Sequence, residues 1–599
     1  MYWPAIYETN GAQTSPSIPL SDWFERRVAN ANAGLAGQTG LDPISYNLAS
    51  GAGGRPFYDN LHNWSPRLAI AWSPDFKDGI GHKLFGSQGK SVFRMGWGMY
   101  YDVFGAGLAR AYDASALGLS TSIQNSSGRL TLADAPRYTG NFDIPQSLIT
   151  AAPPASFPVL QPNAFQINNS LDDKLRAPYV MRWNVSYQRE LKNGWNLSVA
   201  YVASEARRTL TSEDLATPLN IRDPQSGQTW YDAARLAINS MKINNRLEIQ
   251  RPLTDAELRS IGPIPFFENM FPGLAGGGLT ATQGAVQLFQ DETHPDGTYW
   301  LELTDRFSSP SASRLGPFAF YSRQYSYLRA IRSVGFSSYH SMQTSLRKVF
   351  RNGDQFDFNW TWAHSFDLGS VSENQQSVND GLRGIIISPY NRSQMRAESD
   401  FDQRHVWNAN YVYNLPLGRG RRYFNSVGKA ANLLAGGWQL AGLYRQTSRL
   451  PISVGHNRTW PTNYNITGWA TTVGSFEDGT NKNAPASVDG ATTGPNIFQN
   501  PKAALDAFGF TYPGQIGNRN NVRGDGVFNL DLSLAKNFFM PYNERHTMQF
   551  RWEVFNVFNT VRFDPRDINL SLGNRTTFGR YQGTLQPSRV MQLSLRYDF

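Results

Sequence analysis

Apolar and polar side chains alternate strictly in the segment that precedes the C-terminus. Every second residue there is apolar: Met548, Phe550, Trp552 and Val554. The residues between them are polar: Gln549, Arg551 and Glu553. Successive side chains of a β-strand point to opposite faces, so this period of two predicts a strand with one apolar and one polar face. The final segment, 591–599, repeats the pattern and ends on an aromatic residue.

Two pairs of alternating segments are joined by tight turns. In the first pair, the segments around Val185 and Val199 flank the turn Lys192-Asn193-Gly194. In the second pair, the segments around Leu346 and Phe358 flank Arg351-Asn352-Gly353-Asp354. Asn-Gly between two alternating segments is a strong signal for a β-hairpin. Neighbouring strands are therefore expected to pair in antiparallel fashion.

The same period recurs along the chain and predicts about eleven strands. Their expected ranges are 66–73, 90–102, 178–191, 194–207, 338–351, 354–366, 404–415, 436–455, 527–537, 545–556 and 588–599. The connections in chain order are 74–89, 103–177, 192–193, 208–337, 352–353, 367–403, 416–435, 456–526, 538–544 and 557–587. Shorter and longer connections alternate without exception, so every long one emerges at the same end of the sheet.

This asymmetry of the connections distinguishes between the all-β architectures. A soluble sandwich core would explain the alternation alone, but it has no reason to collect its long loops on one side. Outer-membrane barrels have short periplasmic turns and long extracellular loops. No apolar run approaches the roughly 18 residues of a transmembrane helix. The sequence therefore predicts an all-β fold, an antiparallel transmembrane outer-membrane β-barrel with long extracellular loops and a periplasmic C-terminus.

An odd number of strands does not close a single-chain bacterial barrel, because these barrels have an even number. We therefore expect a partial barrel of about eleven or twelve strands. Residues 1–65 are irregular in sequence and are interpreted as the remnant of one more extracellular loop, and 66–599 as the barrel. The long outside loops are expected at 103–177, 208–337, 367–403, 456–526 and 557–587.

The residue types that carry most enzyme chemistry are missing or badly spaced. The absence of Cys excludes disulfides, thiolate zinc sites, iron–sulfur clusters and cysteine nucleophiles. The eight His residues do not have the spacing of a metal site, and Gly-x-Ser-x-Gly does not occur. His405, beside Asp402 and Arg404, is assigned to a structural hydrogen-bond network. We expect no catalytic residue, no cofactor and no metal.

Charge gives no reason to expect a nucleic-acid partner. The 56 Lys and Arg exceed the 47 Asp and Glu by nine, and the basic residues are scattered along the chain. The densest basic run, Arg419 to Arg422, is short. A solvated or lumenal surface explains this excess.

Several segments resemble the C-terminal barrel of TonB-dependent outer-membrane transporters, in particular the Oar-like group. They are Ser65–Trp72, Phe93–Asp102, Tyr201–Ser204, Ser338–Gln343, Leu346–Lys348, Trp360–Ser365, Asp402–His405, Leu415–Gly420, Gly437–Leu440 and Glu553–Asn559. Their order along the chain also matches, and the resemblance covers most of 60–110, 178–210 and 335–599. It implies a barrel of about 22 strands, of which this chain would be the C-terminal portion, and a signal peptide, TonB box and plug domain that this chain does not show.

The resemblance implies transport of a solute too large or too scarce for porin diffusion, with energy from the inner-membrane TonB complex acting through the plug. Siderophores, cobalamin, saccharides and peptides all remain open as ligands. Aromatic side chains in the long loops are candidates for binding such a ligand or for packing the loops together: Tyr299, Trp300, Trp460 and Trp469. An outer-membrane adhesin or surface scaffold without transport is the second hypothesis. A soluble secreted binding protein is the third, and the rows of apolar side chains argue against it.

The C-terminal segment resembles the signal that the outer-membrane assembly machinery reads on barrel proteins. Its apolar residues at alternate positions are Leu593, Leu595, Tyr597 and Phe599. The alternative is simply a last strand. The expected partners are thus this machinery, the TonB complex and outer-membrane lipid.

Deletion of Phe599 should reduce insertion into the outer membrane while synthesis continues. The measurement is the fraction of protein in the outer membrane that shows heat-modifiable gel migration. Unchanged insertion after the deletion would contradict a role for this residue in assembly.

Overall fold

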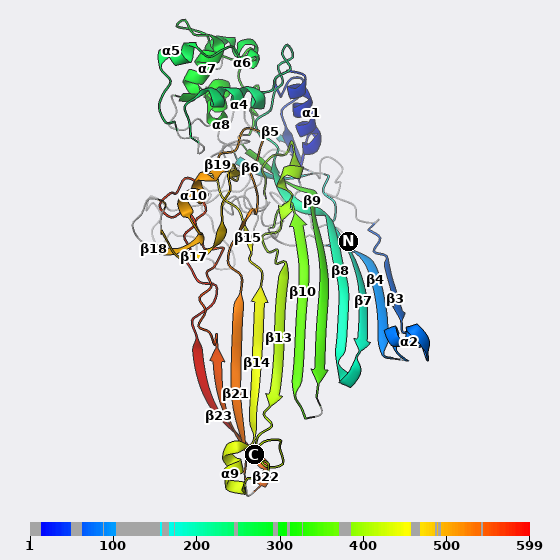
Figure 1. Cartoon of the computed structure of the whole chain (residues 1–599). Coiled ribbons are helices and arrows are strands. Elements are labelled where there is room, and N and C mark those ends of the chain that lie inside the picture. Colours follow the sequence, from blue (N-terminus) through cyan, green and yellow to red (C-terminus); the bar gives the residue numbers. More distant parts are fainter. Residues whose placement is uncertain are drawn as a thin grey trace, which may run out of the picture.

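The structure is a computed structural model of the whole chain. It describes residues 14–48, 63–87, 89–102, 156–158, 167–172, 174–244, 249–290, 297–307, 312–325, 327–350, 352–370, 385–456, 468–485, 488, 493–540 and 543–599. The long strands stand side by side, with most helices and loops gathered above them (Figure 1). We call these the lower and upper ends of the molecule.

Eleven described strands follow one another in a single sheet in which every neighbouring pair is antiparallel. From one edge to the other they are β3 (Arg67–Trp72), β4 (Ser91–Tyr101), β7 (Tyr179–Glu190), β8 (Asn196–Asp214), β9 (Tyr327–Val349), β10 (Gln355–Asp367), β13 (His405–Asn414), β14 (Trp438–Thr447), β21 (Phe528–Met540), β22 (Asn543–Phe555) and β23 (Val590–Asp598). Each overlaps one predicted segment, so the predicted strands and their antiparallel order are confirmed.

Three strand ends differ from the sequence prediction. β8 continues to Asp214 and β9 begins at Tyr327, because these two strands remain paired above the rest of the sheet. β14 ends at Thr447, well before residue 455. Short strands join the sheet at its upper end: β6 (Ile167–Leu171) beside β9, β11 (Ile385–Ile386) beside β8 and β12 (Ala397–Glu398) beside β10.

The pairing register separates the sheet into an apolar face and a polar face. One cross-strand row of the apolar face consists of Ile70, Met95, Val185, Tyr201, Met342 and Trp362. The adjacent row of the polar face includes Arg94, Ser186, Ala200, Gln343 and Thr361. At the other edge, Leu593, Trp552, Leu534, Leu440 and Tyr413 continue the apolar face. The alternation predicted from single strands therefore extends across the whole sheet.

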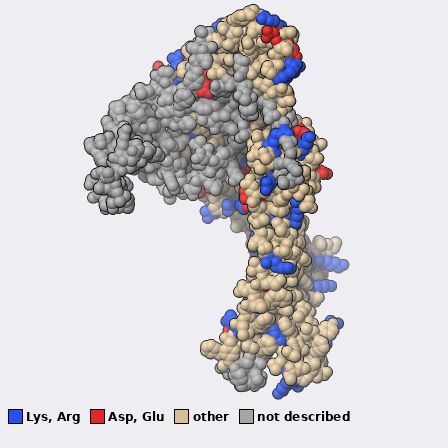
Figure 2. Space-filling model, turned by 90° about the vertical axis from the view of Figure 1, so that its left-hand side faces the viewer, with Lys and Arg blue, Asp and Glu red and all other residues tan. Residues whose placement is uncertain are grey.

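Aromatic side chains mark both ends of the apolar face. Toward the upper ends of their own strands lie Trp97, Trp183, Trp362 and Trp407, and toward the lower ends lie Trp72, Tyr187, Phe356, Tyr413 and Trp438. On β10 the two levels are six residues apart, from Phe356 to Trp362, which is about 20 Å of extended chain. The space-filling view shows the sheet below the loops as a largely uncharged stem (Figure 2). This is the arrangement of an apolar band between aromatic girdles.

Short connections close the lower end. The turn between β7 and β8 is a 3-10 turn, Lys192–Gly194, in which Asn193 and Gly194 have φ of 63° and 74°. Such left-handed backbone is what Asn and Gly tolerate best. Two other lower turns contain short helices, α2 (Gly79–Phe85) and α9 (Lys429–Ala435).

The connection between β8 and β9 forms a helical cap, which we define as the described part of 215–325. Its elements are α4 (Trp230–Ser240), α5 (Asp255–Arg259), α6 (Pro265–Met270), η3 (Pro272–Leu274), α7 (Ala281–Gln290), α8 (Gly297–Glu302) and the π-helical turn η4 (Leu303–Phe307). Capping boxes at Thr229 and Thr254 start α4 and α5. Buried aromatic rings fill its core, with Trp230 and Trp300 stacked at 5.0 Å between centroids.

The interpretation of residues 1–65 as irregular was wrong for α1 (Leu20–Asn32). The helix buries Leu20, Trp23 and Phe24 against the extended part of β8 and β9 and the cap. Its buried Arg27 donates to the carbonyl of Leu215 at 2.7 Å. The helical period of these residues is the signal that the strand pattern elsewhere obscured. Flanking strands form a small sheet: β1 (Thr14–Pro16), β2 (Ser45–Leu48) and β5 (Ser156–Pro158).

A second body of loops covers the upper ends of β14 and β21. We call it the C-terminal loop body and define it as the described part of 448–527 and 556–589. Its elements are β15 (Pro451–Ile452), β16 (Thr471–Thr472), β17 (Asp478–Pro485), β18 (Thr493–Phe498), α10 (Pro501–Asp506), β19 (Phe508–Gly509) and β20 (Val522–Arg523). Its core includes the rings of Phe498, Phe508 and Phe578. Among the described residues, no helix has the length and apolar character needed to cross a bilayer.

Lysine substitutions on the two faces of β8 should have unequal effects. Val199 lies on the apolar face, opposite Thr344, and its neighbour Ser198 lies on the polar face, opposite Ser345. Val199→Lys should lower the free energy of unfolding in lipid vesicles by about 2–4 kcal/mol, the cost of a cation on a lipid-facing position. Ser198→Lys is the matched control and should change it much less. The free energy of unfolding of both variants can be measured by urea titration, with the folded fraction read from heat-modifiable gel migration. Equal losses of this free energy in the two variants would contradict a lipid-facing apolar face.

Candidate functional site

Several polar loop segments meet above the upper ends of β10, β13 and β14. Arg519 is the centre of their contacts, and its guanidinium group is almost fully buried. It donates to Asp367 Oδ1 at 2.6 Å, Ser370 Oγ at 2.7 Å and Asp400 Oδ1 at 3.0 Å. These partners come from the end of β10 and from the segment after β12. One arginine therefore joins three stretches that are far apart in the sequence.

Asn520 extends the network. Its side-chain amide donates to the carbonyl of Glu398 at 2.6 Å and to Asp400 Oδ1 at 2.8 Å. Its backbone N–H donates to Ser453 Oγ at 2.9 Å. Asn520 has φ of 57°, a backbone conformation that Asn adopts more readily than most residues. The pairing of β15 with β20 brings this turn beside the sheet.

A cavity of about 650 Å³ adjoins this network within the C-terminal loop body. Its wall mixes apolar groups with amides and charges, including Ile452, Trp469, Asn569, Arg566 and Asp567. Hydrogen bonds from Arg566 lower the pKa of Asp564, so that this pair stays charged at neutral pH beside the cavity. A cavity with both hydrogen-bonding groups and an indole suits a polar ligand of small or moderate size.

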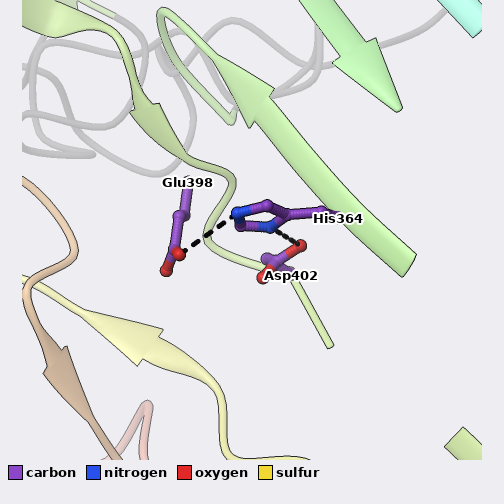
Figure 3. A group of neighbouring side chains, drawn as sticks. All are labelled: His364, Glu398 and Asp402. Atoms are coloured by element: carbon purple, nitrogen blue, oxygen red, sulfur yellow. Dashed lines mark hydrogen bonds and ion pairs between the residues drawn. The ribbon is translucent and has the colours of Figure 1, made fainter. Parts of the chain in front are cut away.

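Three side chains that could ligate a metal lie together on the other side of the network: His364, Glu398 and Asp402 (Figure 3). His364 Nδ1 lies 3.1 Å from Asp402 Oδ1, and its Nε2 lies 3.4 Å from Arg404 Nη2. Arginine only donates, so His364 Nε2 accepts and Nδ1 carries the proton given to Asp402. Glu398 Oε1 is 3.5 Å from His364 Nε2.

The charges around this cluster favour an ion-pair network over a metal centre. Glu398 accepts from Arg404 at 2.5 Å through Oε1 and from Arg523 through Oε2. Two guanidinium groups thus already occupy the space beside the carboxylate that a cation would need, and they supply its positive charge. A metal ion there would meet strong repulsion from both.

His405 takes part in structural hydrogen bonds, as the sequence predicts. Its Nδ1 accepts from Trp360 Nε1 at 3.3 Å, its backbone N–H donates to Ser448 Oγ at 2.7 Å, and its ring stacks with those of Trp360 and Trp407. Its sequence neighbours Asp402 and Arg404 instead contact His364, two residues further along β10 than Trp362. The histidine of that second network is set by strand pairing and not by the sequence motif.

A groove of about 510 Å³ runs along the polar face below these loops. Both cations and anions line it: Arg347, Asp357, Asp531, Arg551 and Glu553. The groove is lined from six strands, β9, β10, β13, β14, β21 and β22. It lies on the face of the sheet away from the apolar band.

Of the four predicted ligand-binding aromatic residues, the two whose side chains the structure describes lie in different parts of the molecule. Trp469 lines the cavity and is 5% exposed. Trp300 is 1% exposed in the core of the cap and donates to the carbonyl of Ala285, so packing is the role that its burial shows. The side chain of Tyr299 and the whole of Trp460 lie outside the described residues.

The proposed assembly residues lie on the last strand of the sheet. Leu593 and Leu595 pair with Trp552 and Phe550 on the apolar face and are well exposed. Tyr597 continues this row, and its ring stacks with that of Phe599 at 6.1 Å. Their exposure is what a recognition signal needs, and their role in assembly stays a prediction.

The residues at the centre of the site were missed by sequence reasoning. Arg519, Asn520 and Arg523 stand in the run 518–526, which contains only Asn, Arg, Asp, Gly and one Val. Such density of hydrogen-bonding side chains was the available signal for an ordered polar turn. Its partners, Glu398 and Asp400, lie over 100 residues earlier, and no local pattern connects them.

Solved structures of outer-membrane receptors show only low similarity to the chain. The outer membrane transporter YddB from Escherichia coli has 10% identity and a TM-score of 0.34, with 92% of this chain and 42% of YddB covered. The siderophore receptor PirA from Acinetobacter baumannii has 8% identity and a TM-score of 0.32, with coverage of 93% and 45%. The pyoverdine outer membrane receptor FpvA from Pseudomonas aeruginosa has 7% identity and a TM-score of 0.32, with 93% of this chain and 39% of FpvA covered. The chain thus spans less than half the length of these structures.

The sequence comparisons give one match, at the level of a family. No curated protein matches the chain. A family model described as an outer membrane beta barrel domain matches residues 2–592. This match covers the helical cap, the C-terminal loop body and the sheet up to the first residues of β23. The chain therefore belongs to the outer membrane beta barrel domain family.

Proposed function

We propose that the protein is the barrel part of a TonB-dependent outer-membrane receptor that binds and takes up a large or scarce polar solute. The observation that carries this proposal is the cavity beside the Arg519 network, together with the charged groove on the polar face. A solute bound among the loops would have a hydrated path along that face. The apolar face would contact lipid.

The orientation follows from the lengths of the connections. Short turns occupy the lower end, and the cap and the C-terminal loop body occupy the upper end. Outer-membrane barrels keep short turns in the periplasm and long loops outside. The loops and cavity would therefore face the medium, and the C-terminus the periplasm.

The cavity wall supports a ligand with several hydrogen-bonding groups. Asn569, Gln582 and Ser453 offer neutral donors and acceptors, and Trp469 offers an apolar surface. A saccharide, a peptide or a siderophore has suitable groups. Inner-membrane TonB would supply the energy, as the resemblance to TonB-dependent transporters implies.

A surface adhesin without transport remains the alternative function. The observation that favours it is the internal packing of the loops, because the cap and the C-terminal loop body each have an aromatic core. Preformed loops of this kind can bind a partner without any transport step.

Uptake should depend on TonB for at least one class of solute. Cells that express the native protein would receive labelled ferric hydroxamate siderophore, cyanocobalamin, a maltooligosaccharide and a short peptide, each in turn. We expect one solute to accumulate in the periplasm with functional TonB and to stay outside without it, because the barrel itself supplies no energy. Surface binding that is identical in both strains, with no accumulation, would support the adhesin and contradict uptake.

Arg519→Met should abolish this uptake while insertion into the membrane continues. The substitution leaves the buried carboxylate of Asp367 without its cation, which costs about 3–5 kcal/mol in comparable sites, and it removes the same cation from the partly exposed Asp400. We expect faster hydrogen exchange in residues 395–402 and 518–523. Arg251→Met, which breaks the exposed pair with Glu257 on the cap, is the control and should leave exchange in these segments unchanged. Unaltered exchange in the Arg519 variant would show that the network does not hold the loops together.

A further inference from the structure

The turn between β13 and β14 differs from the other connections at the lower end. We call residues 415–437 the basic turn; it contains α9 and extends beyond the end of the sheet (Figure 1). It has four cations and no acidic residue: Arg419, Arg421, Arg422 and Lys429. Lys and Arg side chains are visible at the lower end in Figure 2. A net charge of this size in a short segment attracts an anionic surface.

The basic turn also exposes large apolar side chains. Leu434 is 75% exposed, Phe424 60%, Tyr423 52% and Leu433 46%. None of them is needed to pack α9, which has no buried residue. In water, each exposed side chain loses the roughly 1.5–3 kcal/mol that burial of an aliphatic side chain contributes. Their combination with cations is typical of a segment that lies in a membrane interface.

Contacts with the sheet place α9 at the foot of the apolar face. Trp438 Nε1 donates to the carbonyl of Leu434 at 2.9 Å. Lys536 Nζ donates to the carbonyl of Gly436 and lies over the ring of Trp438. Trp438 and Lys536 are cross-strand partners, two residues before Leu440 and two after Leu534 on the apolar face. The helix is thus tied to the side of the sheet that faces lipid.

α2 at the opposite edge shows the same placement. Its Phe85 packs on Trp72 and Phe93 of the apolar face, while Ile80 and Leu84 are well exposed. Two lower turns therefore carry helices on the same side with unpaired apolar residues. The turn that contains α2 also has Asp75 and Asp78, so its charge is mixed and only the basic turn selects an anionic surface.

We propose that the basic turn is a membrane anchor that lies on anionic phospholipids at the lower, periplasmic surface of the outer membrane. Leu433 and Leu434 enter the interface between headgroups and acyl chains, and the four cations contact lipid phosphates. Lys536 and Trp438 hold the helix against the barrel wall. This assignment rests on the membrane orientation proposed above but not on transport or on any ligand.

A single label tests the anchor directly, because the chain has no cysteine of its own. Leu434→Cys in the full chain would carry an environment-sensitive fluorophore, and Gln225→Cys, exposed on the cap, would be the matched control. Both proteins would be reconstituted in phosphatidylcholine vesicles with and without phosphatidylglycerol. We expect the label at position 434 to shift to shorter wavelength and to be quenched by spin-labelled lipid, more strongly with phosphatidylglycerol. The label at position 225 should remain in water.

A charge variant separates lipid attraction from simple proximity. Arg419→Gln, Arg421→Gln, Arg422→Gln and Lys429→Gln together should remove the dependence of quenching on phosphatidylglycerol. Four exposed cations elsewhere serve as the control: Arg26, Lys242, Arg314 and Arg323, all changed to Gln. Heat-modifiable migration would verify that every variant is folded. Emission typical of water at position 434 would overturn the proposal, as would shielding without lipid quenching, which indicates a protein partner. If the labelled protein shows lipid quenching at position 434 but cells that express the native protein take up no solute, the result would count against the proposed transport and not against the anchor.

Discussion

Everything in this molecule depends on continuous antiparallel hydrogen bonding between strands. A bilayer core offers no water to backbone N–H and C=O groups, so each strand must satisfy them through its neighbours. The same pairing fixes the register, and a shift of one residue would move every apolar side chain to the opposite face. Ten successive strand pairs keep that register here, apart from shifts beyond Arg207 of β8 and at the lower end of β21. A lipid-facing surface and a hydrated surface can therefore share one layer of chain.

The upper end follows a different physical rule from the stem. Its loops are long and polar, and they become ordered through buried groups that join distant segments. Arg519 and Asn520 do this for the C-terminal loop body, and Arg27 does it for α1 and the cap. Buried charges of this kind are costly unless fully paired. Their role here is to fix the positions of the loops, because the planar guanidinium group can donate to all its partners in only one arrangement.

The division between what the sequence predicts and what it does not follows these two rules. Strands could be predicted because each carries its own period of two, as in 548–554, and Asn-Gly turns mark where they reverse. The helices of the cap were missed because they are short, and capping boxes such as that of Thr229 were the available signal for where they begin. The candidate site was equally hidden. Arg519 and its partners are more than 100 positions apart in the sequence. Only the cross-strand register shows that Asp402 contacts His364 and not the nearby His405. Trp300 shows that an aromatic residue in a loop gives no indication of whether it faces a ligand or a core.

The eleven successive strands that the structure describes in the sheet have a directional consequence. β3 and β23 are separated by ten antiparallel steps, so the two edge strands run in the same direction. Direct contact between these edges would form a parallel pair. Two copies of the sheet related by rotation about a common barrel axis would meet in parallel pairs at both seams. Antiparallel closure instead requires an odd number of additional strands between the edges, which makes the total even.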